Sequence, residues 1–390
     1  MYSFHSGDTT FNFIDMPGFG DTSGDNEDEL HKKRRYAFLE QIPQIHAIVT
    51  VVKATDTKLS PNFVGSLNDI LSMVPKSAAA NLMFFVTFSW SSGFQTSGIT
   101  ASLESYLGDV NTKYGVSLST RNNIFYVDYF GFLYFLSHCK SEKYRRLTTP
   151  ELLARAHQCW QRTTEAFYAM TRKVLALPGI PSTEIASINF ARTIIEIVTV
   201  QLLDEMKKSI ELRTQFDNPV VRAAQIRGMR KFMPKETARK TDEQVIAMII
   251  KDNFETVRNV IVAALQALLE PAGFLKSHCV APLSNGHSVR LQRQVEVLEN
   301  NGEFDAAEEC EAELIKWKEQ VECFETILKA AKSVGTFSQT VAPTSKLFKL
   351  QLIGKRIQEA VKDYNESAKF EFEDTVKFKA VRPIQEQITS

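Results

Sequence analysis

The stretch that decides the fold runs from Thr10 to Ser23 and reads TFNFIDMPGFGDTS. Apolar and polar residues alternate over 11–14, which predicts a β-strand that ends at Asp15. Proline and glycine follow, which predicts a turn, and Gly18 stands three positions after the acid. Such an acid can hold Mg²⁺ beside a nucleotide, and a glycine amide can approach a phosphate oxygen because no Cβ intervenes. The alternative interpretation is a strand and a turn without a chemical role.

Length and composition bound the class of protein. A chain of 390 residues predicts two or three domains of about 150 residues each. Lys and Arg total 46, and Asp and Glu total 46, so no overall field favours nucleic acid or membrane as a partner. The five cysteines form no C-x-x-C pair, residues 1–9 hold no apolar run, and no apolar stretch reaches about 18 residues. We therefore expect a cytoplasmic protein with reduced thiols and no membrane-spanning helix.

Strand and helix patterns alternate through the first 140 residues. Short, continuous apolar runs predict buried strands over 47–52, 81–86 and 124–127. Apolar residues at helical spacing predict helices over 27–42, 61–74 and 99–114. Strands that alternate with helices in this way indicate a doubly wound α/β sheet.

The string DMPGFGDT, residues 15–22, resembles the Asp-Thr-Pro-Gly-x-Gly-Asp-Thr signature of septins and of the immunity-associated (GIMAP-like, AIG-type) GTPases. Further segments are similar to the GIMAP-like branch in the same order: 51–59, 78–87, 128–135, 160–165 and 187–192. The resemblance covers about residues 1–210. It implies a P-loop GTPase domain that binds GTP or GDP with Mg²⁺. It also implies that Asp15 holds the metal through water, that the Gly18 amide senses the γ-phosphate, and that 18–27 is a switch.

The P-loop of that family, G-x-x-x-x-G-K-[ST], does not occur in these 390 residues. The one Gly-Lys pair, Gly354-Lys355, is followed by Arg356 in a helical tail. In the family, the strand that feeds the P-loop lies between the Asp-x-x-Gly strand and the strand at 47–52. Each buried backbone group left unsatisfied costs about 1–3 kcal/mol, against a domain stability of about 5–15 kcal/mol. We therefore expect a fragment of a longer protein; the alternative is a rearranged pseudo-GTPase whose sheet closes up.

Two further departures concern nucleotide chemistry. The segment that reads guanine in the family would follow the strand at 81–86, and here 87–93 reads TFSWSSG without a carboxylate. Phe19 follows Gly18, where Ras-type enzymes keep the Gln that orients water. Guanine specificity is therefore open, hydrolysis would need another group or a partner subunit, and no catalytic residue is assigned.

The second half of the chain is helical in pattern. We expect four parts: a GTPase-like α/β domain that lacks the P-loop strand (1–145), its helical extension (146–216), a basic linker (217–240) and a helical, coiled-coil region (241–390). Predicted helices cover 150–177, 182 onward, 241–269, a hairpin at 290–331, and 347–372. Spacings of four and three predict a coiled-coil seam of Cys310, Leu314, Trp317, Val321, Phe324 and Leu328.

The basic linker is rich in cations. One acid, Glu236, stands among Arg222, Arg227, Arg230, Lys231, Lys235, Arg239 and Lys240. One interpretation is a patch for an anionic membrane or nucleic acid; the other, which we favour, is a solvated loop, because no set of stacking aromatic residues accompanies the charges.

Two hypotheses for function follow from the sequence. The first is a GTP-binding switch of the septin/GIMAP-like class, incomplete in these residues, whose helical half acts on assembly or on a protein partner. The second is a non-catalytic pseudo-GTPase that acts as a scaffold through its coiled-coil arm.

Overall fold

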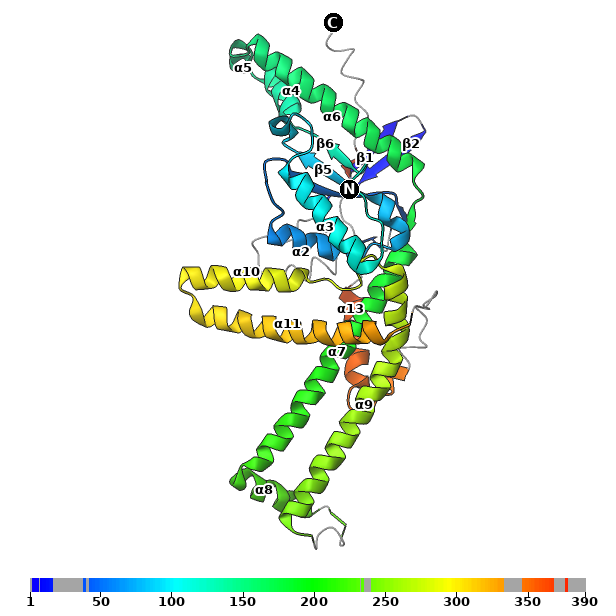
Figure 1. The fold of residues 1–390 in the computed structure, drawn as a ribbon, viewed down its shortest axis with the longest axis vertical. Helices are drawn as coiled ribbons and strands as arrows, with labels where there is room; N and C mark the ends of the chain where they lie inside the picture. The colour runs from blue at the N-terminus through cyan, green and yellow to red at the C-terminus, as the bar shows by residue number, and fades with distance from the viewer. Residues whose placement is uncertain are drawn as a thin grey trace.

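The computed structural model describes residues 2–6, 8–16, 38–39, 42–231, 233–234, 240–332, 346–367 and 376–377. The molecule is elongated, with an α/β unit in the upper part of Figure 1 and a long helical arm below it. Three predicted features lie outside the described residues: Gly18, the switch at 18–27 and most of the helix expected over 27–42.

A three-stranded parallel sheet forms the centre of the α/β unit. Its strands are β4 (Ile48–Lys53), β5 (Leu82–Thr87) and β6 (Ile124–Tyr126), in the order β4-β5-β6. Between successive strands run α2 (Pro61–Leu71) and α3 (Gly98–Tyr114). The expectation of a mixed α/β fold with a parallel sheet is confirmed.

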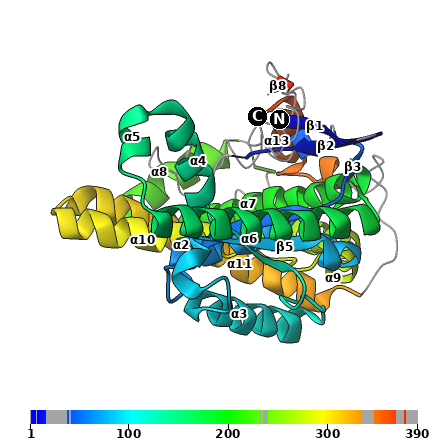
Figure 2. The ribbon, with the colours of Figure 1, turned by 90° about the horizontal axis from the view of Figure 1, so that it is seen from above.

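Helices cover both faces of this sheet. On one face, Leu71 of α2 and Leu103 of α3 pack with Phe84 of β5, and all three are fully buried. On the other, Met170 of α6 (Pro150–Ala176) packs against Met83 and Phe125. Figure 2, seen from above, shows β5 between α6 and α3. Burial on both faces explains why the strands read as continuous apolar runs.

The strand predicted around 11–14 exists, but it belongs to a different sheet. β2 (Thr9–Phe13) pairs antiparallel with β1 (Tyr2–Ser6), and β1 pairs with β8 (Val376–Lys377). In the described part of the chain, β2 and β4 do not pair, so the parallel sheet does not close up around the hairpin. A further two-stranded pairing joins β3 (Gln44–Ile45) to β7 (Ile180–Pro181).

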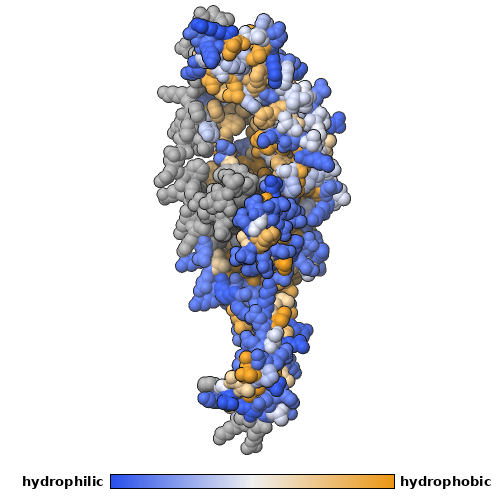
Figure 3. Space-filling view, turned by 90° about the vertical axis from the view of Figure 1, so that its left-hand side faces the viewer, coloured by the Kyte–Doolittle hydropathy of each residue, from blue (hydrophilic) through white to orange (hydrophobic). Residues whose placement is uncertain are grey.

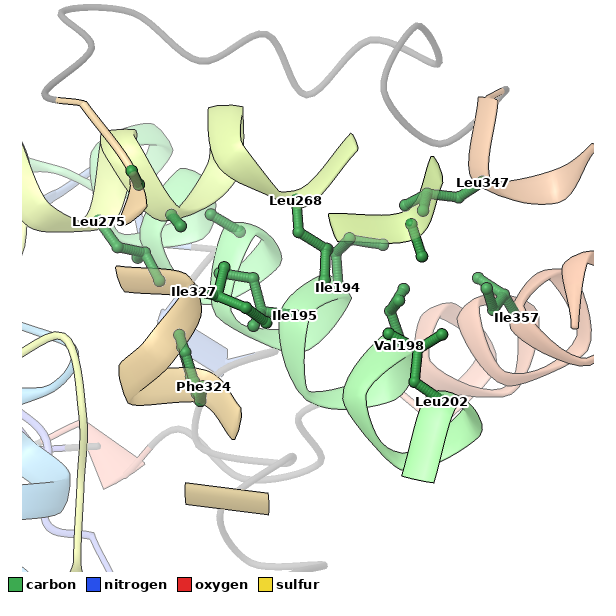
Figure 4. Packing of buried hydrophobic residues seen from close by; sticks show 14 of the residues in the cluster. Ile194, Ile195, Val198, Leu202, Leu268, Leu275, Phe324, Ile327, Leu347 and Ile357 are labelled. Atoms are coloured by element: carbon green, nitrogen blue, oxygen red, sulfur yellow. The ribbon is translucent and has the colours of Figure 1, made fainter. Parts of the chain in front are cut away.

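The helical half is built on a core where four helices meet. These are α7 (Ser182–Asp217), α9 (Asp242–His278), α11 (Phe304–Ala330) and α13 (Gly354–Ser367). Figure 4 shows Ile194, Ile195 and Val198 of α7 against Leu268 of α9, with Phe324, Leu347 and Ile357 around them. Beyond this core, α7 and α9 continue side by side to the tip of the arm, where α8 (Pro219–Arg230) joins them.

By length and composition, α7 and α9 are each apolar enough to cross a membrane, contrary to the expectation that no stretch would be. Buried residues make up 56% and 44% of their apolar windows, and a core helix satisfies the same criteria.

Three sequence predictions need correction. The stretch expected to be a solvated loop contains α8, which Asn218 caps with its side chain and which buries Ile226. Helix α9 does not end at Pro271 but runs to His278, because the residues after the proline are buried in the core. The last predicted helix is interrupted: residues 346–348 are helical, and α13 begins at Gly354 after a turn.

The predicted helical hairpin is present as α10 (Gly286–Asn301) and α11, joined at Gly302. The residues expected to form one seam divide between two clusters. Cys310 and Leu314 pack against Leu291 of α10, whereas Phe324 belongs to the core with α7 and α9.

A buried ion pair fixes the hairpin to the α/β unit. Arg290 of α10 lies 2.8 Å from the carboxylate of Asp69 on α2, and the two side chains are 9% and 3% exposed. The Ser284 hydroxyl donates to the same carboxylate at 2.6 Å. Gly65 and Gly286 let the backbones of the two helices touch, because a Cβ at Gly286 would lie 2.6 Å from the Gly65 carbonyl oxygen.

Candidate functional site

The carboxyl ends of parallel strands are where α/β proteins bind ligands. Backbone hydrogen bonds hold these ends together beyond the strands themselves. The Ala54 amide donates to the Thr87 carbonyl at 2.8 Å, and the Val127 amide donates to the Val86 carbonyl at 2.9 Å. The Thr87 hydroxyl donates to the Val52 carbonyl at 3.1 Å. This edge is therefore a rigid platform on which the following loops rest.

The loop after β5 occupies the place where the family resemblance expects guanine to be read. Phe88 and Phe94 adopt left-handed backbone conformations, with φ of 57° and 58°, on either side of a short 3-10 segment at 89–92. The buried Ser89 hydroxyl donates to the Val86 carbonyl at 2.6 Å, which closes the loop on its own strand. Non-glycine residues hold such conformations only where the surroundings enforce them.

The structure brings a carboxylate to this loop from a distant part of the sequence. Asp128, which follows β6, is 7% exposed and accepts from the Trp90 amide at 3.0 Å and the Phe130 amide at 2.8 Å. Its own amide donates to the Thr163 hydroxyl of α6 at 2.9 Å. The sequence placed Asp128 after a predicted strand and at the start of the segment 128–135 that resembles the GIMAP-like branch, without giving it a role. Because each carboxylate oxygen accepts a backbone amide, this side chain braces two loops and is not presented to a ligand.

Aromatic rings and one guanidinium line the outside of the same loop. The guanidinium of Arg155 lies 4.8 Å from the Trp90 ring and 4.5 Å from the Phe130 ring. Phe88 and Tyr129 meet edge to face at 4.9 Å. Flat faces of this kind can stack on a planar ligand. No signal in the sequence could find the group, because its members come from three separate segments.

A thiol beneath the loop is inert at neutral pH. Burial raises the pKa of Cys159 to about 11, and the negative charge of Asp128 adds to the rise. The reactive form of cysteine is the thiolate, so Cys159 is a core thiol rather than a nucleophile.

Of the two residues assigned to the metal and the phosphate, the structure describes one, Asp15. Asp15 is exposed in the coil two residues beyond the end of β2, a strand that is not part of the parallel sheet. Gly18 is outside the described residues. Among the described residues, no group of three His, Cys, Asp or Glu side chains converges on a metal site. Asp15 could therefore contribute one ligand of a hydrated Mg²⁺, with the remaining ligands supplied by water and phosphate.

Among the described strands, β4 is an outermost strand of the parallel sheet, and apolar side chains on one of its faces are exposed. In the described part of the chain, β4 pairs with β5 alone, and its Val49 and Val51 are 37% and 57% exposed. The hairpin reaches the same side of the sheet, because Phe13 of β2 stacks on Phe167 of α6 at 5.8 Å. Edge strands of parallel sheets are seldom left open in this way.

A hollow of about 460 Å³ lies on the opposite edge, between β6 and α6. Lys173 is its one lysine, and that side chain already donates to the Asn122 carbonyl at 2.8 Å and to Asn123. Desolvation lowers the pKa of Lys173. The other cation of the lining is Arg162, whose guanidinium lies 3.7 Å from the Glu165 carboxylate and whose side chain is 59% exposed.

The segments that carry the resemblance include residues with structural roles. Asn81 is buried and donates to the His46 carbonyl at 2.8 Å and the Pro178 carbonyl at 3.0 Å. Arg192 of α7 is 3% exposed and donates to the Ser72 carbonyl at the end of α2. These contacts hold the helical half against the sheet.

Comparison with protein-family models, with curated proteins and with solved structures finds no match for this chain.

Proposed function

We propose that this chain is the larger part of a GTP-binding switch protein of the septin/GIMAP-like class, with GTP or GDP and Mg²⁺ as ligands and a cytoplasmic location. The observation that carries the proposal is the parallel sheet β4-β5-β6, with helices on both faces and loops gathered at its carboxyl ends. The string at 15–22 supplies the family resemblance, and the order of strands and helices along the chain is the order expected from that resemblance.

The residues present fit only part of a nucleotide site. They offer Asp15 for the metal and an aromatic wall beside Trp90, but no glycine-rich cradle and no P-loop lysine. The outer edge of β4, which pairs with no strand in the described part of the chain, supports the view that one more strand belongs between β4 and the hairpin. We therefore expect the 390 residues alone to bind nucleotide weakly and to hydrolyse none.

Titration with a fluorescent GTP analogue and Mg²⁺ tests this proposal. We expect no saturation in the micromolar range with the 390-residue chain, and saturation with a form extended by a P-loop encoded upstream. Asp15→Asn in the extended form should weaken the Mg²⁺ dependence. Micromolar binding by the 390-residue chain would refute the claim of incompleteness, and no binding by the extended form would end the switch hypothesis.

The alternative is a non-catalytic pseudo-GTPase that acts as a scaffold through its helical half. Two observations favour it: β2 lies outside the parallel sheet, and both oxygens of Asp128 accept backbone amides. On this hypothesis, partner binding or self-association by the helical region is independent of nucleotide. Sedimentation of the extended form with and without GTP separates the two functions.

A further inference from the structure

Helix α4 (Phe130–Lys140) presents an apolar stripe to solvent. Tyr129, Phe132, Leu133 and Leu136 are 48%, 54%, 43% and 44% exposed. Their spacing of three, one and three residues places them on one face of the helix. A surface helix in a globular protein normally turns such a face toward the core, so this stripe requires an explanation.

The inner face of α4 is complete without the stripe. Tyr134 is 1% exposed and lies among the rings of Phe130, Phe135 and Tyr144. Gly131 allows close packing on α6, since a Cβ there would lie 2.8 Å from the Ala156 carbonyl oxygen. The exposed residues therefore add nothing to the packing of α4 on α6.

Neighbouring elements extend the stripe into a patch. Leu147 follows α5 (Glu142–Arg146) and is 67% exposed, and Leu152 and Leu153 at the start of α6 are 37% and 38% exposed. We call these seven residues the corner patch: Tyr129, Phe132, Leu133, Leu136, Leu147, Leu152 and Leu153. In Figure 3, apolar and polar surface lie side by side at the upper end of the molecule. Exposed apolar residues gathered on neighbouring elements in this way are typical of an interaction site.

Cations follow the patch residues of α4, at the end of that helix and in α5. We call Lys140, Lys143, Arg145 and Arg146 the collar; all four are exposed. Against these four stands one carboxylate within 138–148, Glu142, which pairs with Arg146. Glu151, at the start of α6, is the next acid along the chain. The collar thus leaves an excess of positive charge beside large aliphatic and aromatic side chains.

We propose that the corner patch and its collar dock on the surface of an anionic lipid membrane. The apolar side chains enter the boundary between headgroups and acyl chains, and the cations pair with lipid phosphates and carboxylates. The corner lies at one end of the long axis of the molecule, so it can reach a flat surface (Figure 1). This proposal does not require a bound nucleotide, although the corner patch shares Tyr129 with the aromatic group beside Trp90.

Charge argues against the other occupants. A symmetric contact between two copies would bring two collars together, and like charges in an interface cost several kcal/mol. A nucleic acid would match the cations but would leave the leucines of the patch in contact with phosphates.

Co-sedimentation of the full chain with lipid vesicles tests the proposal. We expect binding to phosphatidylcholine vesicles that contain about one third phosphatidylserine, and at least about tenfold weaker binding to phosphatidylcholine alone. Raising the salt concentration should weaken the binding, because screening shortens the reach of the collar.

Two sets of variants separate the apolar and the charged contributions. Phe132→Ser with Leu133→Ser and Leu136→Ser should lower the partition coefficient by about tenfold or more. Lys143→Gln with Arg145→Gln should lower it by about fivefold per charge on anionic vesicles. Thermal unfolding should change little in either set, since all these side chains are exposed.

Matched controls come from other parts of the surface. Phe304→Ser with Ile315→Ser removes apolar side chains that are 69% and 54% exposed on α11, and Arg227→Gln with Lys231→Gln removes cations at the tip of the arm. Both controls should bind vesicles like the unchanged protein. Equal losses in the controls, or no binding to anionic vesicles, would overturn the proposal.

Cys139 provides a direct reporter of insertion in a Cys323→Ser background, because it is exposed at the end of α4, whereas Cys159, Cys279 and Cys310 are buried and Cys323 is half-buried. An environment-sensitive fluorophore on Cys139 should shift to shorter wavelength when anionic vesicles are added. The absence of a shift in a protein that sediments with vesicles would show that another surface binds. Light scattering that finds a dimer, abolished by the triple serine variant, would assign the patch to a second copy and would also overturn the proposal.

Discussion

The two ends of the long axis both carry cations, yet they differ in what surrounds the charge (Figure 1). At the tip of the arm, Arg230 pairs with Asp242 at 2.5 Å, and Val220 is the one described residue of α8 among the exposed large apolar side chains. At the α4–α5 corner, the collar borders seven exposed apolar side chains. Charge alone attracts an anionic surface weakly, whereas charge beside apolar area can hold it. The comparison teaches that the density of Lys and Arg along the sequence is a poor guide to which surface is the better candidate for membrane binding.

The largest expected effect concerns the anchor of the corner, Tyr134. Tyr134→Ala should lower the free energy of unfolding by about 3–5 kcal/mol, because it removes a ring that is 1% exposed. Chemical denaturation measures the change.

The matched control is Tyr134→Phe, because the buried hydroxyl of Tyr134 has no hydrogen-bond partner among the described residues. Tyr134→Phe should be neutral or stabilising. A loss of more than about 1 kcal/mol in Tyr134→Phe would show that the hydroxyl is bonded and that the corner is packed differently.

At the tip, Ile226→Ala should open α8 locally, because the hydrophobic cluster around Ile226 has only three buried members among the described residues. Hydrogen exchange measures this opening.

The next effect is a pH dependence that belongs to the corner alone. The pKa of Cys159 is raised to about 11 by burial, so the unfolded chain loses this proton at lower pH than the folded protein. The stability contributed by the neutral thiol is fully present below the ordinary thiol pKa of 9.0 and is lost as the pH rises toward 11. In the unchanged protein this loss lowers the free energy of unfolding by up to about 2–3 kcal/mol at alkaline pH, and Cys159→Ala should abolish that decrease. Equal alkaline profiles in the two proteins would contradict the burial of the thiol.

Adding one methyl group should act with opposite sign at the two ends. Gly131→Ala should cost about 1–3 kcal/mol, because its Cβ would lie 2.8 Å from backbone atoms of Ala156 and Trp160. Gly228→Ala should stabilise by about 0.5–1 kcal/mol, because no atom lies within 4 Å and alanine favours a helix. Melting temperatures of the two variants give the sign. Destabilisation by Gly228→Ala would mean that the tip is more closely packed than described.

The smallest effect concerns the ion pair at the tip. Arg230→Gln should lower stability by less than about 1 kcal/mol, because the side chains of Arg230 and Asp242 are 32% and 57% exposed. The effect of Arg230→Gln should shrink further in high salt.

The buried ion pair between Arg290 and Asp69 is the contrasting case. Arg290→Gln would leave Asp69 charged and buried and should lower the free energy of unfolding by about 3–5 kcal/mol. Similar losses for the two substitutions would show that exposure does not govern the strength of these pairs.

Much of the fold could be predicted from local patterns. The strands near 47–52, 81–86 and 124–127 and the helices near 61–74 and 99–114 appear within a few residues of the predicted bounds. Continuous β-branched runs and amphipathic spacing are local signals that packing on two faces reinforces. Helix α9 was predicted too short, because proline is a local helix breaker. Burial of Phe274 and Leu275 in the core offsets the cost of the proline.

The candidate site could be predicted only in part. Asp15 and Gly18 were assigned from one string and from family resemblance, and their roles remain predictions. The brace formed by Asp128, Trp90 and Thr163 depends on contacts across 35 and 38 residues of sequence, which no local pattern reveals. The separation of β2 from the parallel sheet likewise depends on which strands can pair.

The sequence by itself determined the alternation of strands and helices, the neutral charge balance and the missing P-loop, because each is a property of composition or of neighbouring residues. Only the tertiary structure decided which apolar helix faces are covered. The spacing of Phe132, Leu133 and Leu136 is the same as that of a core stripe, and burial depends on the neighbours that α6 provides to the opposite face of α4. A pattern specifies that a helix has an apolar side; packing determines whether that side meets protein or remains open to a partner.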